Sequence, residues 1–203
     1  MLYPLSYGAQ PANGPIVTVA KSDPTIVIGM IPAATTGLRS ALVATMLILA
    51  GCVQQAPPEP AVLRSGAPPW PAPRDGISYF ELAGVPSSRL DDRTGQQVLT
   101  IGIRIDDTEV PLVPGIGMDL PRALQAPAHT HDASGTVWLE GAGAREVTLV
   151  QFFTLWGVRL DSRCLGAACG TLTVTADGQF VGTPANLVLQ TVDDVQIWLT
   201  SGA

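Results

Sequence analysis

The first clear pattern in the chain is an alternation of apolar and polar residues over 98–105. The alternation is imperfect, but a period of two over a short segment is typical of a β-strand with one buried face. Asp106 and Asp107 follow and favour a turn, and apolar residues return at Val110 and Leu112. This part of the chain is therefore predicted to form a β-hairpin.

A second hairpin is predicted in the segment APAHTHDASGTVWLE. Asp132 at the first position and Gly135 at the fourth suit a type I turn between two short strands. Because side chains alternate between the faces of a strand, we expect Trp138 on the same face as Thr136 and Glu140.

The period changes in the segment VTLVQFFTLWG. Its large apolar residues recur at the spacing of one helix face, at Leu149, Phe152, Phe153 and Trp156. Thr148 and Gln151 have the spacing of a capping box, and Gly157 can end a helix. We predict a short amphipathic helix over 149–156 whose aromatic stripe lies in the core. The alternative is that the stripe lines a ligand pocket.

The rest of the chain again shows β patterns. The pair Asp177 and Gly178 favours a tight hairpin turn, and Val195, Ile197 and Leu199 share one face of a last strand. The order hairpin, hairpin, helix, hairpin, strand predicts an α+β fold, a mostly antiparallel or mixed β-sheet with one short helix packed on it. The element order is similar to a β-grasp-like arrangement.

The composition fits one such domain and excludes some functions. The 203 residues are 46% hydrophobic and 14% charged, which allows one domain with a substantial core. A formal net charge of -6 argues against nucleic-acid binding, which needs a basic surface. After Cys52 the chain contains no lysine, so a polybasic membrane-binding patch is not expected either.

The segment GLRSALVATMLILAGC resembles the signal of bacterial lipoproteins. Arg39 supplies a positive charge, 41–50 is a run of apolar and small residues, and Leu-Ala-Gly-Cys follows. The resemblance implies cleavage before Cys52 and lipidation of that residue, which would anchor the chain on the extracytoplasmic face of a bacterial membrane. A transmembrane helix is the alternative, but the run is shorter than the roughly 20 residues that a bilayer requires.

These signals divide the chain into four parts. We expect residues 1–29 to be an over-long gene start before Met30, and 30–51 to be the lipoprotein signal peptide. Seven of the 24 residues that follow Cys52 are proline, so 52–75 is predicted to be a proline-rich tether. Residues 76–203 are predicted to form a single α+β domain. Trp70, inside the tether, is expected to pack on that domain, although it could bind a partner's aromatic groove.

The other two cysteines are predicted to form a disulfide. Cys164 and Cys169 lie in the segment CLGAAC, close enough for a tight loop to bring them together, and the expected compartment is oxidising. Two thiolate metal ligands are the alternative, but they would need further ligands from distant residues.

His129 and His131 are the candidate metal ligands. Alternate residues of a strand point to one face, so the two imidazoles are expected side by side, and imidazole is a common ligand for copper and zinc. A tight site needs a third ligand. Asp132 is the nearest candidate, although its carboxylate could instead hold the turn; Glu140, Asp119 and Glu109 are further carboxylates that folding could bring close.

Other site chemistries lack support in the sequence. The cupin pattern needs a glutamate a few residues after the histidine pair and a later histidine, whereas Gly135 and Thr136 stand in the place of that glutamate and no third histidine exists. Neither the serine-hydrolase motif Gly-x-Ser-x-Gly nor a Walker-type phosphate loop is present. Because only two metal ligands are evident, we expect a binding protein more than an enzyme.

The segments HTHDASGTVWLE, VTLVQFFTLWGVRL, LTVTADGQFV and PANLVLQTVDDVQIWL together resemble a family of secreted or membrane-anchored bacterial proteins, largely of unknown function. Its members share a His-Thr-His-Asp and Ser-Gly segment and a Thr-Leu-x-Gln-Phe-Phe helix that ends in Trp-Gly. The resemblance covers Val98 to Leu199. Many members carry further histidines on the upstream hairpin, where this chain has Ile101, Ile103 and Ile105. The resemblance implies a domain exposed outside the cytoplasm, and no particular reaction.

The sequence therefore predicts a lipid-anchored extracytoplasmic binding or interaction domain. Its partners would be the membrane, through the lipid on Cys52, and an envelope protein. The alternative is a lipoprotein that binds copper or zinc through His129, His131 and a carboxylate.

Overall fold

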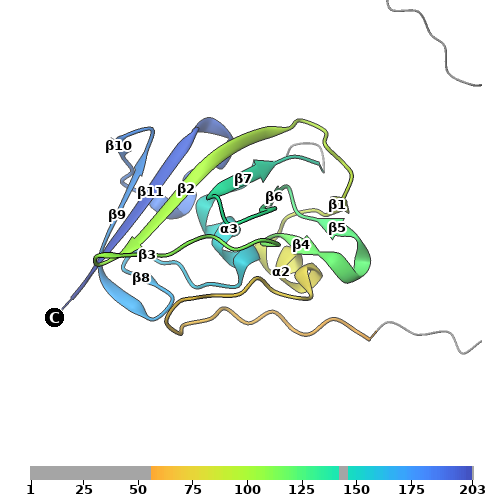
Figure 1. The fold of residues 1–203 in the computed structure, drawn as a ribbon, viewed down its shortest axis with the longest axis horizontal. Coiled ribbons are helices and arrows are strands. Elements are labelled where there is room, and N and C mark those ends of the chain that lie inside the picture. The colour runs from red at the N-terminus through yellow and green to blue at the C-terminus, as the bar shows by residue number, and fades with distance from the viewer. Residues whose placement is uncertain (1–55, 142–145, 203) are drawn as a thin grey trace, which may run out of the picture. The chain divides into compact units, whose positions relative to one another are not determined.

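The structure is a computed structural model that describes residues 56–141 and 146–202. Within these ranges the fold is α+β and mostly β-sheet, with two α-helices, α2 (Gly76–Ala83) and α3 (Leu149–Trp156) (Figure 1). The strands are β1 (Ser88–Arg89), β2 (Gln97–Ile105), β3 (Thr108–Glu109), β4 (Met118–Asp119), β5 (Leu124–Gln125), β6 (Ala128–His129), β7 (Thr136–Leu139), β8 (Cys164–Leu165), β9 (Ala168–Ala176), β10 (Gln179–Phe180) and β11 (Asp194–Ser201). Short 3-10 helices cover Leu120–Arg122, Pro184–Asn186 and Leu189–Thr191.

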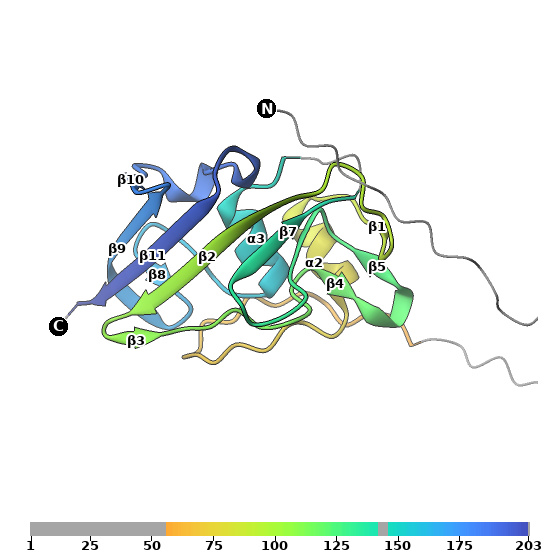
Figure 2. The same ribbon diagram turned by 45° about the horizontal axis from the view of Figure 1, so that its top comes forward.

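The larger of two sheets has the strand order β10-β9-β11-β2-β7-β6, with β3 paired to β2 and β8 paired to β9. The long strands β9, β11 and β2 lie side by side in both views (Figures 1 and 2). β2 and β11 run parallel and the other neighbours run antiparallel, so the sheet is mixed, as predicted. The smaller sheet is antiparallel and has the order β1-β5-β4.

One hydrophobic core joins the larger sheet to both helices. The predicted inner face of the last strand is confirmed, because Val195, Ile197 and Leu199 are buried. In β2 the buried series starts at Leu99, whereas Val98 is 45% exposed. The imperfect alternation in the sequence thus resolves into a strand whose first apolar residue points away from the core.

The predicted helix is confirmed with its caps. The Thr148 side chain accepts a hydrogen bond from the amide of Gln151, whose side chain in turn accepts one from the amide of Thr148. Gly157 ends the helix in the left-handed conformation, with φ 71°. The aromatic residues of the stripe are fully buried and belong to the core, as predicted: Phe152, Phe153 and Trp156.

The three predicted hairpins are present, but the return strand of the first one is shorter than predicted. Around Asp177 and Gly178, β9 and β10 pair antiparallel across a tight turn. β2 and β3 pair across the Asp106 turn, but the return strand is only two residues long. Its pairing continues as a single bond from the amide of Val110 to the carbonyl of Ile103 (2.9 Å) and does not extend through Leu112.

Residues of the proline-rich segment, ahead of Gly76, also pack against the domain. The Trp70 side chain is 2% exposed and meets Trp156 edge to face, with ring centroids 5.6 Å apart. The Trp156 indole N–H donates to the carbonyl of Trp70 (3.0 Å), and Arg64 forms a backbone bridge with Val158. The folded unit therefore includes part of the segment that the sequence assigned to a tether.

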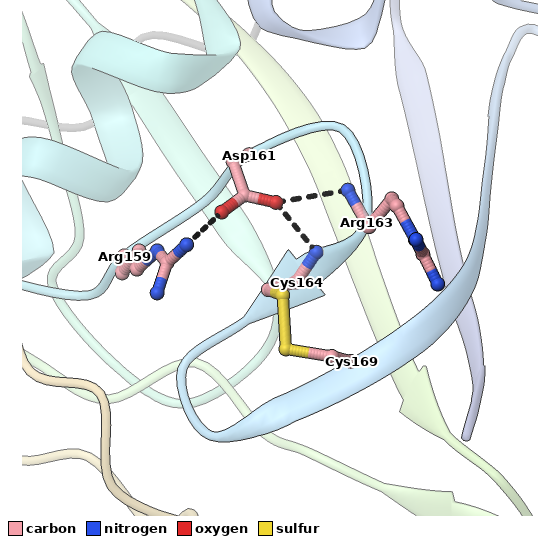
Figure 3. Close-up of a disulfide and its surroundings, with 5 residues drawn as sticks. All are labelled: Arg159, Asp161, Arg163, Cys164 and Cys169. Atoms are coloured by element: carbon pink, nitrogen blue, oxygen red, sulfur yellow. Dashed lines mark hydrogen bonds and ion pairs between the residues drawn. A yellow bond between two sulfur atoms is a disulfide. The ribbon is translucent and has the colours of Figure 1, made fainter. Parts of the chain in front are cut away.

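Cys164 and Cys169 form the predicted disulfide (Figure 3). The two residues lie opposite each other in the β8–β9 pair, with Cα atoms 4.1 Å apart. The Asp161 carboxylate accepts hydrogen bonds from the amides of Arg163 (2.9 Å) and Cys164 (2.8 Å) and pairs with Arg159, which holds the start of this hairpin in place.

A buried carboxylate, Asp119, ties α2 to the smaller sheet. It accepts hydrogen bonds from the amides of Ile77 (2.9 Å) and Arg122 (3.0 Å) and pairs with the Arg122 guanidinium at 3.0 Å. Arg122 also contacts Asp75 at 3.0 Å. Three donors thus depend on one fully buried side chain.

The lipidation site at Cys52 and the signal segment lie outside the described residues. Among the residues that the structure does describe, none of the helices has the length and apolar character needed to span a membrane.

Replacing Asp119 by alanine should destabilise the fold. Asp119→Ala leaves two backbone amides and the mostly buried Arg122 without this acceptor, so we expect the free energy of unfolding to fall by about 3 kcal/mol. The matched control is Asp91→Ala, because its pair with Arg89 is exposed, at 74% and 82%, and should change stability by less than about 1 kcal/mol. Chemical denaturation measures both, and equal losses would contradict the role given to Asp119.

Candidate metal centre

The β6–β7 hairpin places His129 and Glu140 beside Trp138, on the face of the sheet opposite the core. Val137 and Leu139 are buried in the core, so Trp138 between them points to the other face. His129 lies opposite Trp138 in the register of β6 with β7 and shares that face. Glu140, next after β7, lies two residues beyond Trp138, and its carboxylate lies beside the His129 imidazole.

A neighbouring loop covers His129, whose side chain is fully buried. The amide of Thr130 donates to the carbonyl of Ile116 (3.0 Å), which holds this loop against β6. Gly117 has φ 70°, and a Cβ there would collide with the carbonyl of Ala128 and come within 3.1 Å of the His129 Cβ. Only glycine allows the loop to approach this closely.

The hydrogen bond at Nδ1 determines the orientation and tautomer of the His129 ring. Nδ1 lies 3.0 Å from the carbonyl oxygen of Ala126, which can only accept, so we assign the proton to Nδ1. Nε2 then carries a lone pair. This atom is buried without a hydrogen-bond partner and lies 3.4 Å from Oε1 of Glu140.

The Glu140 carboxylate is held from its other side. Its side chain is 2% exposed, and its Oε2 accepts a hydrogen bond from Nε2 of Gln96 at 2.8 Å. The backbone amide of Glu140 donates to the carbonyl of Pro127 (3.1 Å). These two bonds leave Oε1 facing His129.

His131 completes the group from the solvent side. It lies beyond the end of β6 and is exposed, yet its ring centroid is 5.0 Å from that of His129, with the planes at 85°. On its other side it meets the Trp138 ring at 5.3 Å. The two imidazoles therefore lie together, as the sequence predicted, but one is buried and the other is exposed.

The structure brings Glu140 to the histidine pair. The candidate ligand atoms of His129, His131 and Glu140 all lie within 4.8 Å of one another. The other candidate carboxylates have different places: the Asp132 side chain accepts a hydrogen bond from the amide of Ser134 (2.8 Å), Asp119 pairs with Arg122, and Glu109 is exposed on β3 opposite Arg104. Asp132 thus holds the turn, which was the alternative given for it.

Burial and hydrogen bonding shift two pKa values here. Desolvation is the largest influence on His129 and lowers its pKa below the usual 6.5, while the carbonyl of Ala126 acts in the opposite direction. The charge of His131 lowers it further, and Glu140 raises it. Hydrogen bonds from the hydroxyl and the amide of Ser134 lower the pKa of Asp132.

The donor set and its spacing fit a transition metal. A tetrahedral ion bound 2.0–2.1 Å from each ligand atom holds neighbouring ligands roughly 3.4 Å apart. His129 Nε2 and Glu140 Oε1 are already separated by 3.4 Å. His131 would have to move closer, and its exposed side chain has room to do so.

Two features that support the cluster were not predicted from the sequence. Gln96 lies more than 40 residues from Glu140 along the chain, and Gly117 belongs to a loop with no regular pattern. Neither has a local signal, because each acts only through a contact that the tertiary fold creates.

The lowered pKa of His129 predicts a pH dependence of stability. The folded state binds this proton more weakly than the unfolded chain, so the contribution of His129 is fully present above pH 6.5 and decreases as the pH falls through the folded-state pKa. We expect the free energy of unfolding of the metal-free chain to decrease between about pH 7.5 and about pH 5. Denaturation midpoints at a series of pH values measure this decrease.

His129→Gln should reduce this dependence, whereas His131→Gln, at the exposed position, should leave the contribution of His129 in place. If His131→Gln reduced the pH dependence of the free energy of unfolding more than His129→Gln did, the assignment to His129 would be refuted.

Comparisons with protein-family models, with curated proteins and with solved structures find no match to this chain. The resemblance to a secreted or membrane-anchored bacterial family stays a prediction from the motifs. The cluster of His129, His131 and Glu140 is the feature from which a function can be inferred.

Proposed function

We propose that this chain is a metal-binding domain in which His129, His131 and Glu140 hold one divalent transition-metal ion. The proposal is carried by the buried Nε2 of His129, which has no hydrogen-bond partner and faces Oε1 of Glu140 at 3.4 Å. Two atoms that present lone pairs to each other away from water repel, and a buried polar atom without a partner is costly. A metal ion between them converts both into ligands.

A proton is the other cation that could lie between these two atoms. It would make His129 an imidazolium paired with Glu140. Burial opposes that charged form, since desolvation is the largest influence on the pKa of His129 and lowers it. The surrounding bonds also suit ligation: metal-binding histidines commonly donate their other ring N–H to a carbonyl, and ligating carboxylates are themselves hydrogen-bonded. Ala126 and Gln96 supply these two contacts.

The donor set favours a borderline divalent ion. Two imidazole nitrogens and one carboxylate oxygen suit Zn(II), Cu(II), Ni(II) and Co(II), whereas Cu(I) prefers the sulfur ligands that this cluster lacks. Copper and zinc are the ions that we propose.

We further propose that this is the specific activity of a lipid-anchored extracytoplasmic binding domain, with Cys52 as the lipidated residue. The lipoprotein-like signal segment supports this location, and the Cys164–Cys169 disulfide is typical of proteins outside the reducing cytoplasm. For the fold we propose a β-grasp-like arrangement. Its support is the parallel pairing of β2 with β11 and the packing of α3 into the same core as both strands.

Metal titration of the full chain, produced without a polyhistidine tag, tests the site. We expect saturable binding of one Cu(II) or Zn(II) ion per chain at neutral pH. His129→Ala, His131→Ala and Glu140→Gln should each weaken binding at least about tenfold, because loss of a supporting residue alone typically costs 10- to 100-fold. Cu(II) should also quench Trp138 fluorescence, and Trp138→Phe should lose that part of the quenching while still binding the ion.

Asp132→Asn is the matched control. It changes a carboxylate next to His131 that holds the turn, so metal affinity should stay within a few-fold of the unchanged chain. Binding no tighter than that of a short His-x-His peptide would refute the proposed site.

Metabolic labelling tests the lipid anchor. Labelled palmitate should enter the protein in a bacterial host and should be absent from the Cys52→Ala variant, which is expected in the soluble fraction. Label that persists in the variant would contradict lipidation of Cys52.

A further inference from the structure

We propose that the metal ion in this cluster keeps a coordination position open toward solvent, where a small exogenous anion binds. This inference rests on the proposed function, because it concerns the same ion. An open site can exchange ligands, whereas a closed site only supports the fold.

The number of protein donors favours an open position. Structural zinc sites use four protein ligands, and sites with three keep a further position for water or another ligand. Within the described residues, three side chains form the cluster, and the chain contains no other histidine. Cys164 and Cys169 are joined to each other, and residues 142–145, which follow soon after Glu140, are Ala-Gly-Ala-Arg and offer no carboxylate, thiol or imidazole.

The burial of the ligands indicates the direction of the open position. His129 and Glu140 are 0% and 2% exposed, and protein atoms occupy the inner side of the cluster: the Gly117 loop over His129 and the Gln96 amide behind Glu140. His131 is exposed. A further ligand therefore has access from the side of His131, where solvent reaches the cluster.

Charge indicates the class of ligand. A divalent ion bound to two neutral imidazoles and one carboxylate retains one positive charge. In a site that is largely removed from water, this charge attracts a small anion more strongly than it would in bulk solvent. Hydroxide, azide and short carboxylates have this chemistry.

Cobalt and azide provide the test. The full chain is loaded with one equivalent of Co(II), whose visible absorption reports the number and geometry of its ligands, and sodium azide is then added stepwise. We expect a saturable shift of the cobalt bands on azide addition. Asp132→Asn should give the same cobalt spectrum and the same azide response, because its carboxylate is engaged in the turn.

Three outcomes would overturn the inference. Stoichiometric cobalt binding with a spectrum that azide does not change would show a closed site, while leaving the proposed metal binding intact. A cobalt spectrum that Asp132→Asn alters before azide is added would show that Asp132 fills the fourth position. Absence of stoichiometric cobalt binding, together with failure of the copper and zinc titrations, would refute the proposed function and this inference with it.

Discussion

β2 is the strand on which both parts of the larger sheet depend, because it pairs with β11 on one side and with β7 on the other. Its register sets Leu99 opposite Val137 and directs both into the core. A shift of β7 by one residue would turn Trp138 inward and Val137 outward, since side chains alternate strictly between the faces of a strand. The pairing that forms the core therefore also sets the place of Glu140 beside the histidines.

The cluster is an exception to the rule that polar groups in a folded chain either reach water or find a hydrogen-bond partner. Nε2 of His129 neither reaches water nor has a hydrogen-bond partner, although Nδ1 of the same ring is hydrogen-bonded to the carbonyl of Ala126. A protein that needed only stability could place an apolar side chain here. Departures of this kind from local consistency are expected at functional positions, and this one lies beside two more side chains that could bind a metal ion, His131 and Glu140.

Elements with a strong local period could be predicted from the sequence, and elements held by tertiary contacts could not. The helix over 149–156 has both its stripe and its caps in the sequence, whereas α2, of the same length, has no side-chain N-cap bond. The two-residue strands of the smaller sheet are too short to show any period. At the site, the His-x-His pair was evident, but the choice of Glu140 over the nearer Asp132 depends on the register of β6 with β7.

The packing of Trp70 on Trp156 makes part of the proline-rich segment belong to the fold, so only a short length of chain lies between Cys52 and the packed residues. The segment contacts the fold ahead of Arg64: the Glu59 carbonyl accepts a hydrogen bond from the Ser78 hydroxyl, and the Val62 amide donates one to the Tyr79 hydroxyl. Glu59 is seven residues after Cys52, and that length of chain has a fully extended reach of about 25 Å. With the proposed lipid on Cys52, the domain would sample only a thin layer next to the bilayer. Metal or ligand exchange at His131 would then be confined to molecules that enter that layer.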